Sequence, residues 1–205
     1  MSAPTIEYFY SAHSAFAWLG HERLRRIAAE KGRRIVHKPV PLDPLLEAAG
    51  SIGFRARPQG HLTYFFGREI TRWAEERGKT WLGRIPTHHR TSYAFANAML
   101  IAAQEAGADV DALSGAFLST HWEKDADLSD RAQLSEIAKG VGVDPAPLLQ
   151  AAETPEIVAI HEANAAEAIE RSVFGSPTYF VDGDMFYGQD RLEMVARACD
   201  KAYAA

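Results

Sequence analysis

Cysteine is nearly absent from this sequence. Its 205 residues include one cysteine, Cys199, so no disulfide can form within the chain and no Cys-x-x-Cys redox motif exists. Leu192 and Val195 precede Cys199 at helical spacing, which favours a small buried apolar side chain over a reactive nucleophile. Any chemistry that needs a reactive thiol would therefore have to obtain it from a ligand.

Positive charge and long apolar runs are also scarce. The formal net charge is −5 and no basic stripe is present, so we expect neither nucleic acid nor an anionic membrane surface as a partner. No run of about 18 apolar residues could span a membrane, and the N-terminus lacks the basic and apolar pattern of a signal peptide. These absences predict a cytoplasmic protein.

A metal site is not indicated, although the sequence has eight histidines. There is no His-Glu-x-x-His motif and no spacing that would place three ligands on one face of an element. The remaining composition, with 47% apolar and 24% charged residues, is ordinary for a globular protein. The length suits one large or two modest domains.

The first 41 residues have the pattern of a strand, a helix and a second strand. Residues 6–10 form a short aromatic run that ends in the polar residues 11–14, which is typical of a strand followed by a turn. Apolar residues then recur at helical spacing over 16–28, and Gly32 follows as a helix stop. Residues 34–40 predict a second strand. A right-handed crossover would place the two strands parallel in one sheet.

The middle of the chain is predicted to be helical. Apolar residues at spacings of three and four predict helices over residues 62–73, 92–106, 111–122, 131–139, 146–152 and 155–171. Helix stops are expected at Gly78, Gly107 and Gly140. No flexible linker joins this region to the rest, so we expect the helices to pack on the sheet.

The stretch after these helices predicts a β-hairpin. Residues 178–181 are β-branched or aromatic, Asp182-Gly183 supplies the positive φ of a tight turn, and residues 185–187 form a second apolar run. Pro177 stands at the entrance of the first strand, where its missing N–H is tolerated. The sequence leaves open whether its peptide bond is cis. Residues 188–191 open a final helix.

This order of elements resembles a thioredoxin-like fold. The expected class is α/β, with a β-α-β and β-β-α sheet domain formed by residues 1–43 and 172–205 and an all-helical insertion over residues 44–171. In that superfamily the proline before the hairpin is cis, and the main chain of the residue before it pairs with the cysteine of a bound peptide or glutathione. By this resemblance, Ser176 and Pro177 form the wall that faces a bound thiol.

Ser14 lies where the first predicted strand gives way to the first predicted helix. Its simplest role is that of an N-cap, whose hydroxyl accepts a hydrogen bond from a nearby main-chain N–H. A helix N-terminus also favours an anion by about 0.3 to 1 kcal/mol, and a hydroxyl donating to a thiolate adds about 1.5 to 3 kcal/mol. Ser11 competes for this second role, because residues 11–14 have the spacing of a redox motif with serines in place of thiols.

Two blocks of the sequence carry a more specific resemblance. Residues 14–20, Ser-Ala-Phe-Ala-Trp-Leu-Gly, resemble the Ser-Pro-Phe/Tyr-Ser-Tyr-Leu-Ala signature of 2-hydroxychromene-2-carboxylate isomerases and of the related kappa-class glutathione transferases. Residues 172–192 resemble the Val-Phe-Gly-x-Pro-Thr, hairpin and Gly-(Asn/Gln)-Asp-Arg-Leu block of the same DsbA-like proteins. The match implies that Ser14, and not Ser11, is the catalytic serine, and that the cofactor is glutathione.

The resemblance also assigns a glutathione-binding turn. Tyr187, Gly188, Gln189 and Asp190 match the residues at the start of the last helix that hold glutathione. Main-chain N–H groups there can bind its γ-glutamyl carboxylate, and the Asp190 carboxylate can bind its amino group. The alternative for Asp190 is a plain helix cap.

The helical insertion departs from the family where the substrate would bind. The Asn-Arg pair of the isomerases is Ala56-Arg57 here, and their Pro-x-Asn loop is Pro86-Thr87-His88-His89-Arg90. Arg57 and His89 are therefore the expected contacts of a small aromatic carboxylate. A cationic cluster suited to a carboxylate is expected from Arg57, Arg84, His88, His89 and Arg90. A solvated surface is the alternative for that cluster.

The resemblance implies a glutathione-dependent isomerase of aromatic degradation, acting by reversible addition of the glutathione thiolate. Ala17 occupies the resolving position of a redox motif, which excludes dithiol–disulfide exchange. A kappa-like glutathione transferase or peroxidase would use the same thiolate but consume it. A non-catalytic glutathione-binding protein is the third alternative. A homodimer is possible.

Overall fold

A four-stranded sheet in the order β2-β1-β3-β4 organises the chain. The computed structural model describes residues 3–53 and 56–204. Residues 1–2, 54–55 and 205 of the ranges predicted above therefore lie outside the described residues. Strands β1 (Thr5–Tyr10) and β2 (Arg34–Pro39) are parallel, whereas β3 (Thr178–Val181) is antiparallel to β1 and to β4 (Asp184–Tyr187).

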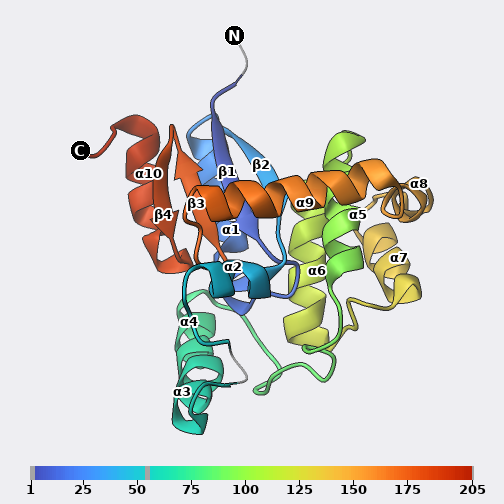
Figure 1. Ribbon diagram of the computed structural model, residues 1–205, viewed down its shortest axis with the longest axis horizontal. Helices are drawn as coiled ribbons and strands as arrows, with labels where there is room; N and C mark the ends of the chain where they lie inside the picture. The colour runs from blue at the N-terminus through green and yellow to red at the C-terminus, as the bar shows by residue number, and fades with distance from the viewer. Residues whose placement is uncertain (1–2, 54–55, 205) are drawn as a thin grey trace.

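Helices surround this sheet and extend beyond it (Figure 1). In chain order they are α1 (Ala15–Glu30), α2 (Leu42–Ala48), α3 (Gln59–Thr63), the π-helical segment η2 (Tyr64–Glu69), α4 (Ile70–Glu76), α5 (Ala94–Glu105), α6 (Val110–Lys124), α7 (Arg131–Gly140), α8 (Pro145–Ala151), α9 (Pro155–Glu170), the 3₁₀ turn η3 (Gln189–Arg191) and α10 (Leu192–Asp200). Figure 1 shows α9 crossing in front of the sheet, α1 behind it, and α3 with α4 reaching away below.

Alternating side chains of β1 fill a separate core on each face of the sheet. Tyr8 and Tyr10 pack with residues of α1, α5, α6 and α10 in the larger cluster. Phe9 points to the opposite face and packs with Phe180 and with residues of α2 and α9. Helices therefore cover both faces, which explains why β1 reads as a nearly continuous apolar run. The larger cluster joins the sheet to the insertion in one core.

The predicted thioredoxin-like architecture is confirmed, including the parallel β-α-β unit and the C-terminal hairpin. Asp182 and Gly183 have φ of 51° and 92°, the positive values that the Asp-Gly turn predicted. Gly32 also has a positive φ, 59°, just after α1. The bond between Ser176 and Pro177, which the sequence left open, is cis.

Helix boundaries were less predictable. Helix α2 was not foreseen. Pro41 precedes it, and Pro44 lies in its first turn, where a missing N–H leaves no hydrogen bond unmade. The helix predicted over 62–73 runs from Gln59 to Glu76 and includes a π-helical segment. Helix α7 ends at Gly140 as predicted, although Gly140 is its last helical residue and the positive φ, 76°, falls at Gly142.

Helix α5 attaches the insertion to the sheet through two side-chain amides. Asn97 is fully buried, accepts a hydrogen bond from Ala12 N (3.0 Å) and donates one to Val40 O (3.0 Å). Gln104 accepts from His37 N (2.7 Å) and donates to His37 O (3.0 Å). Gln104 thus bonds to the main chain of β2 much as a further strand would, and Asn97 joins the turn after β1 to the residue after β2. The expected packing of the insertion on the sheet is observed.

We predict that Asn97→Ala lowers the free energy of unfolding by about 2 to 5 kcal/mol, because two buried main-chain groups each lose a partner. Urea denaturation with an unchanged slope measures this loss. Gln104→Ala is the matched control and should lose only about 1 to 2 kcal/mol, since Gln104 is partly exposed and water can replace its amide there. A loss below 1 kcal/mol for Asn97→Ala would show that this amide does not anchor α5.

Candidate active site

Ser14 begins α1 directly after β1 and a short turn. Its backbone is extended, with φ of −69° and ψ of 123°, and its hydroxyl accepts a hydrogen bond from Ala17 N at 3.2 Å, as an N-cap does. The same hydroxyl donates to the main-chain oxygen of Ser176 at 3.2 Å. That distance is long for an O–H···O bond, whose usual length is about 2.7 to 2.8 Å. A stronger acceptor beside Ser14 could therefore take over this hydrogen.

Ser176 and Pro177 lie opposite the start of α1. Ser176 is partly buried, and its hydroxyl accepts a hydrogen bond from Ser11 N at 3.1 Å. Pro177 is buried, and its carbonyl accepts from Gly188 N at 2.9 Å. Ser11 is fully buried, and its hydroxyl pairs with His13 Nδ1 at 3.0 Å. Ser11 thus lies in the buried interior of the turn, whereas Ser14 faces the open space beside it.

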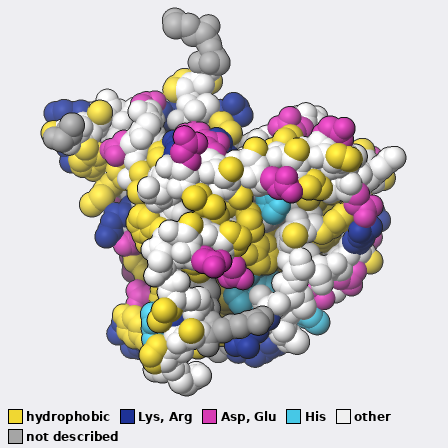
Figure 2. All heavy atoms as spheres, viewed as in Figure 1, with side chains coloured by type: hydrophobic (Ala, Val, Ile, Leu, Met, Phe, Trp, Pro, Cys, Tyr) yellow, Lys and Arg dark blue, Asp and Glu magenta, His cyan; other side chains and the backbone are white. Residues whose placement is uncertain are grey.

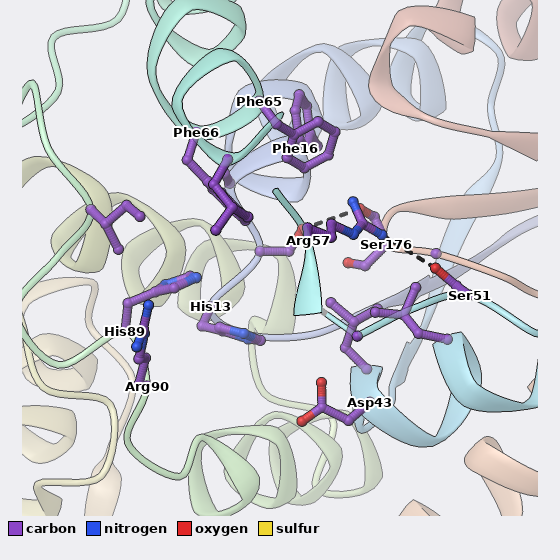
Figure 3. A pocket seen from close by; sticks show the side chains of 18 of the residues that line it. His13, Phe16, Asp43, Ser51, Arg57, Phe65, Phe66, His89, Arg90 and Ser176 are labelled. Carbon is purple, nitrogen blue, oxygen red and sulfur yellow. Dashed lines mark hydrogen bonds between the residues drawn. The ribbon is translucent and has the colours of Figure 1, made fainter. Parts of the chain in front are cut away.

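That space is a cavity of about 730 Å³ between the sheet end and the insertion. Most of its wall is apolar or aromatic, including Phe16 of α1, Phe65 and Phe66 of η2, and Tyr93 before α5 (Figure 3). Figure 2 shows histidine atoms in the hollow below α2, with hydrophobic side chains around it. Its size is that of a site for a small-molecule ligand.

Several of the residues predicted as site residues share this wall, although they come from distant parts of the sequence. They are Ser14, Arg57, His89, Ser176 and Tyr187. The Tyr187 ring packs directly on Gly175, where an added Cβ would lie 2.4 Å from the ring. The sheet unit therefore supplies the serines and Tyr187, and the insertion supplies Arg57 and His89.

Of the predicted glutathione-binding turn, Tyr187 lines the cavity, whereas Gly188, Gln189 and Asp190 do not. Gly188 has φ of 99° and leads into η3. Gln189 is buried against Gly20 of α1, and its side-chain oxygen accepts from Arg77 at 3.1 Å, so a ligand could meet only its main chain. Asp190 is exposed and pairs with Arg191. Neither η3 nor α10 has a side-chain cap, so the alternative of Asp190 as a plain helix cap is wrong.

Arg57 carries positive charge into the cavity wall. Its guanidinium donates to Ile52 O and to Ser51 Oγ, each at 3.3 Å, and lies over the Phe65 ring at 5.8 Å. Arg57 thus combines a charge with a fixed position beside an aromatic surface.

The expected cationic cluster is only partly present. Arg84 pairs with Asp125 at 2.6 Å and His88 with Asp127 at 3.2 Å, and neither lines the cavity. Arg90 does line it, together with Arg57. Burial and the neighbouring His121 lower the pKa of His89 to about 3, so this side chain is neutral and not cationic. Two of the five expected cations therefore remain at the cavity.

The sequence did not reveal the histidine group beside Ser14. His13 lines the cavity, stacks on Tyr93 with ring centres 3.7 Å apart, and lies 4.8 Å from the His89 ring. Burial holds the pKa of His13 well below its ordinary value. The only sequence signal was that His13 adjoins Ser14. Within the described part of the chain, no group of three or more His, Cys, Asp or Glu side chains could hold a metal ion.

Cys199 is remote from this site. It lies in α10, is partly buried and packs against the main core, and its main-chain oxygen accepts a hydrogen bond from Arg33 at 3.3 Å. Burial raises the pKa of its thiol, which disfavours the reactive thiolate. The expectation of an unreactive side chain agrees with this placement.

Known proteins resemble the chain over nearly its whole length. A 2-hydroxychromene-2-carboxylate isomerase from Sphingobium xenophagum is 26% identical over 93% of this chain and 95% of its own. The solved structure of a 2-hydroxychromene-2-carboxylate isomerase superposes with a TM-score of 0.78 at 22% identity, covering 96% of this chain and 95% of that one. A cytosolic disulfide reductase, DsbM, from Pseudomonas aeruginosa, solved with GSH, gives a TM-score of 0.62 at 16% identity, covering 97% and 93%.

These matches confirm the resemblance that residues 14–20 and 172–192 indicated. None of the helices within residues 3–53 and 56–204 combines the length and apolar character needed to cross a bilayer. The family model of the DSBA-like thioredoxin domain matches residues 5–200. The chain therefore belongs to the DSBA-like thioredoxin family.

Proposed function

We propose that the protein is a glutathione-dependent isomerase of a small aromatic carboxylate, of the 2-hydroxychromene-2-carboxylate type. The observation that carries this proposal is the Ser14 hydroxyl at the N-terminus of α1, in the wall of a large aromatic cavity that contains no cysteine. Relatives named as such isomerases match nearly the whole chain and support the substrate class.

The groups around Ser14 suit the thiol of glutathione. The amides of Ala15 and Phe16 belong to the first turn of α1, where no helical acceptor exists for them, and both residues line the cavity. The Ser14 hydroxyl holds its present acceptor weakly, and Ser176 offers main-chain groups across from it. A relative of the same fold was solved with GSH. Asp190 and the main chain of the η3 turn would hold the γ-glutamyl end.

The magnitudes are sufficient to ionise a thiol at neutral pH. The helix N-terminus favours an anion by about 0.3 to 1 kcal/mol, and a hydroxyl donating to it adds about 1.5 to 3 kcal/mol. At 1.36 kcal/mol per pKa unit, the two together lower a thiol pKa from about 8.5 to about 6 or 7. When bound, glutathione would supply a thiolate that adds reversibly to a conjugated carbon of the substrate, so that a double bond becomes rotatable, and glutathione is then released unchanged.

The insertion would hold the second ligand. Arg57 brings a guanidinium into the cavity wall, and this group can donate paired hydrogen bonds to a carboxylate. Phe16, Phe65 and Phe66 provide apolar faces for an aromatic ring. Ser14 and Arg57 line the same cavity, so Arg57 would orient the substrate carboxylate while Ser14 holds the thiolate.

We predict that the purified protein converts 2-hydroxychromene-2-carboxylate to its ring-opened trans isomer only when glutathione is added. The pool of free glutathione should stay constant over many turnovers, because the thiol is returned in each cycle. Substrate conversion is followed by ultraviolet absorbance, and free thiol is titrated at intervals. Stoichiometric loss of glutathione would instead establish a transferase or peroxidase. Binding of glutathione without any conversion of the substrate would indicate a non-catalytic glutathione-binding protein.

We predict that Arg57→Gln raises KM about 10- to 100-fold, the effect of losing a charge-assisted hydrogen bond of about 1.5 to 3 kcal/mol. The value of kcat should change less, because Arg57 holds the carboxylate equally before and during the reaction. Arg57→Lys is the matched control and should recover part of the loss, since it keeps the charge but not the planar fork. An unchanged KM in Arg57→Gln would remove Arg57 from the substrate site.

A further inference from the structure

A chain of hydrogen bonds fixes which nitrogen of His89 carries a proton. His121 Nδ1 lies 2.8 Å from the carbonyl oxygen of Ala126, and His89 Nδ1 lies 3.0 Å from His121 Nε2. A carbonyl only accepts, so His121 Nδ1 must donate. In a neutral ring the other nitrogen then has no proton, so His121 Nε2 accepts and His89 Nδ1 donates. His89 Nε2 is left as a bare lone pair.

Both rings are held neutral by their surroundings. Burial is the main cause that lowers the pKa of each ring; for His121 it outweighs the Ala126 carbonyl and the carboxylates of Asp125 and Asp127, which act in the opposite direction. The titratable groups that face His89 are His13, His121 and Arg90, and none of them is an anion that would favour a charged ring. His89 Nε2 is therefore an acceptor and not a donor.

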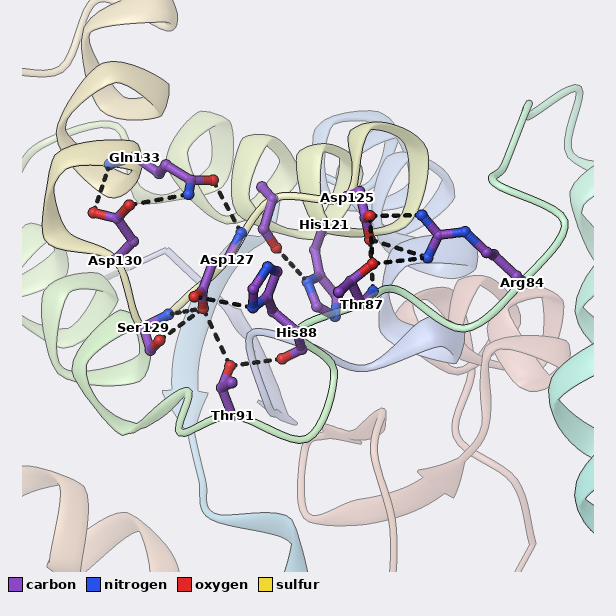
Figure 4. A network of polar contacts seen from close by, with 11 residues as sticks. Arg84, Thr87, His88, Thr91, His121, Asp125, Asp127, Ser129, Asp130 and Gln133 are labelled. Carbon is purple, nitrogen blue, oxygen red and sulfur yellow. Dashed lines mark hydrogen bonds and ion pairs between the residues drawn. The ribbon is translucent and has the colours of Figure 1, made fainter.

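Two carboxylates hold the segment that carries His89 (Figure 4). Before it, Asp125 accepts from Thr87 N at 2.6 Å and from Thr87 Oγ1 at 2.7 Å. After it, Asp127 accepts from Thr91 Oγ1 at 3.1 Å and also pairs with His88. Both carboxylates lie in the segment that joins α6 to α7, next to the Ala126 carbonyl that orients His121. The tautomer and the position of His89 are thus set by the same short segment.

The His89 ring points into the cavity beside His13 (Figure 3). Among residues 3–53 and 56–204, no side chain or main-chain group donates to His89 Nε2. A ligand oxygen without a hydrogen, such as a carboxylate oxygen, would meet a lone pair there and be repelled. A hydroxyl would instead donate a hydrogen bond.

We propose that His89 Nε2 is a fixed hydrogen-bond acceptor that selects aromatic carboxylates bearing a hydroxyl donor, while Arg57 takes the carboxylate. The proposal deepens the function given above and rests on it for the ligand class. His89 was expected to be one cation of a carboxylate site. In this proposal it is instead a neutral side chain that accepts a hydrogen bond from a substrate hydroxyl. Substrates that differ from 2-hydroxychromene-2-carboxylate but keep a hydroxyl and a carboxylate fall within this class.

The test uses the full-length protein and ligands that need no turnover. The probes are 2-, 3- and 4-hydroxycinnamate, each paired with its methyl ether, which keeps the oxygen but cannot donate. Calorimetric titration should show at least one hydroxycinnamate binding about tenfold tighter than its ether, the effect of one hydrogen bond to an acceptor in the cavity wall. His89→Phe should bring that ratio close to one. His61→Phe, which makes the same change at an exposed histidine that does not line the cavity, should keep the ratio.

Nitrogen-15 NMR of the wild-type imidazoles supplies a second measurement that depends on no variant. His89 Nε2 should have the shift of an unprotonated nitrogen, and Nδ1 that of a protonated one. A protonated Nε2, the absence of any preference for the hydroxyl, or an equal preference in wild type and His89→Phe would each overturn the proposal. Because none of these measurements uses glutathione or turnover, a failed isomerase assay and a failed acceptor site are distinguishable.

Discussion

The Ser14 hydroxyl makes two hydrogen bonds that join segments 162 residues apart in the sequence. It accepts from Ala17 N at the start of α1 and donates to Ser176 O before β3. The parallel crossover from β1 to β2 forces α1 to begin at the end of β1, and β3 lies next to β1 in the sheet (Figure 1). The helix N-terminus and the turn before β3 therefore meet at one point. The candidate site is arranged around that point.

The helical insertion turns this meeting point into the wall of a cavity that is partly open to solvent. Without it, Ser14 and Ser176 would lie on an open surface in water, where a hydrogen bond to an anion is worth less. Asn97 and Gln104 fix α5 to the edge of the sheet, and Asp125 and Asp127 fix the segment that carries His89. These four polar side chains lie away from the proposed reaction site but fix the positions of the side chains that line it. The fold resembles that of a solved disulfide reductase, but the described residues that line the cavity here include no cysteine.

Local patterns in the sequence predicted the strands, the hairpin and most helices, because apolar spacing and Asp-Gly turns act over a few residues. Ser14 and Ser176 could be proposed together only through the family resemblance, since nothing local relates residues so far apart. The neutral state of His89 was not predictable, because it depends on burial and on His121, which approaches from another helix. The π-helical segment η2 and the pairing of Arg84 with Asp125 likewise arise from tertiary contacts.

The central claim is that Ser14 and the N-terminus of α1 hold a glutathione thiolate. Ultraviolet titration of the thiol of bound glutathione, in wild type and Ser14→Ala side by side, tests it most directly. If Ser14 holds the thiolate, we expect a thiol pKa of about 6 to 7 in the wild-type complex and a value about one to two units higher in the variant. An unchanged titration curve in Ser14→Ala, together with a lower melting temperature, would show that Ser14 is only a helix cap and does not hold a thiolate.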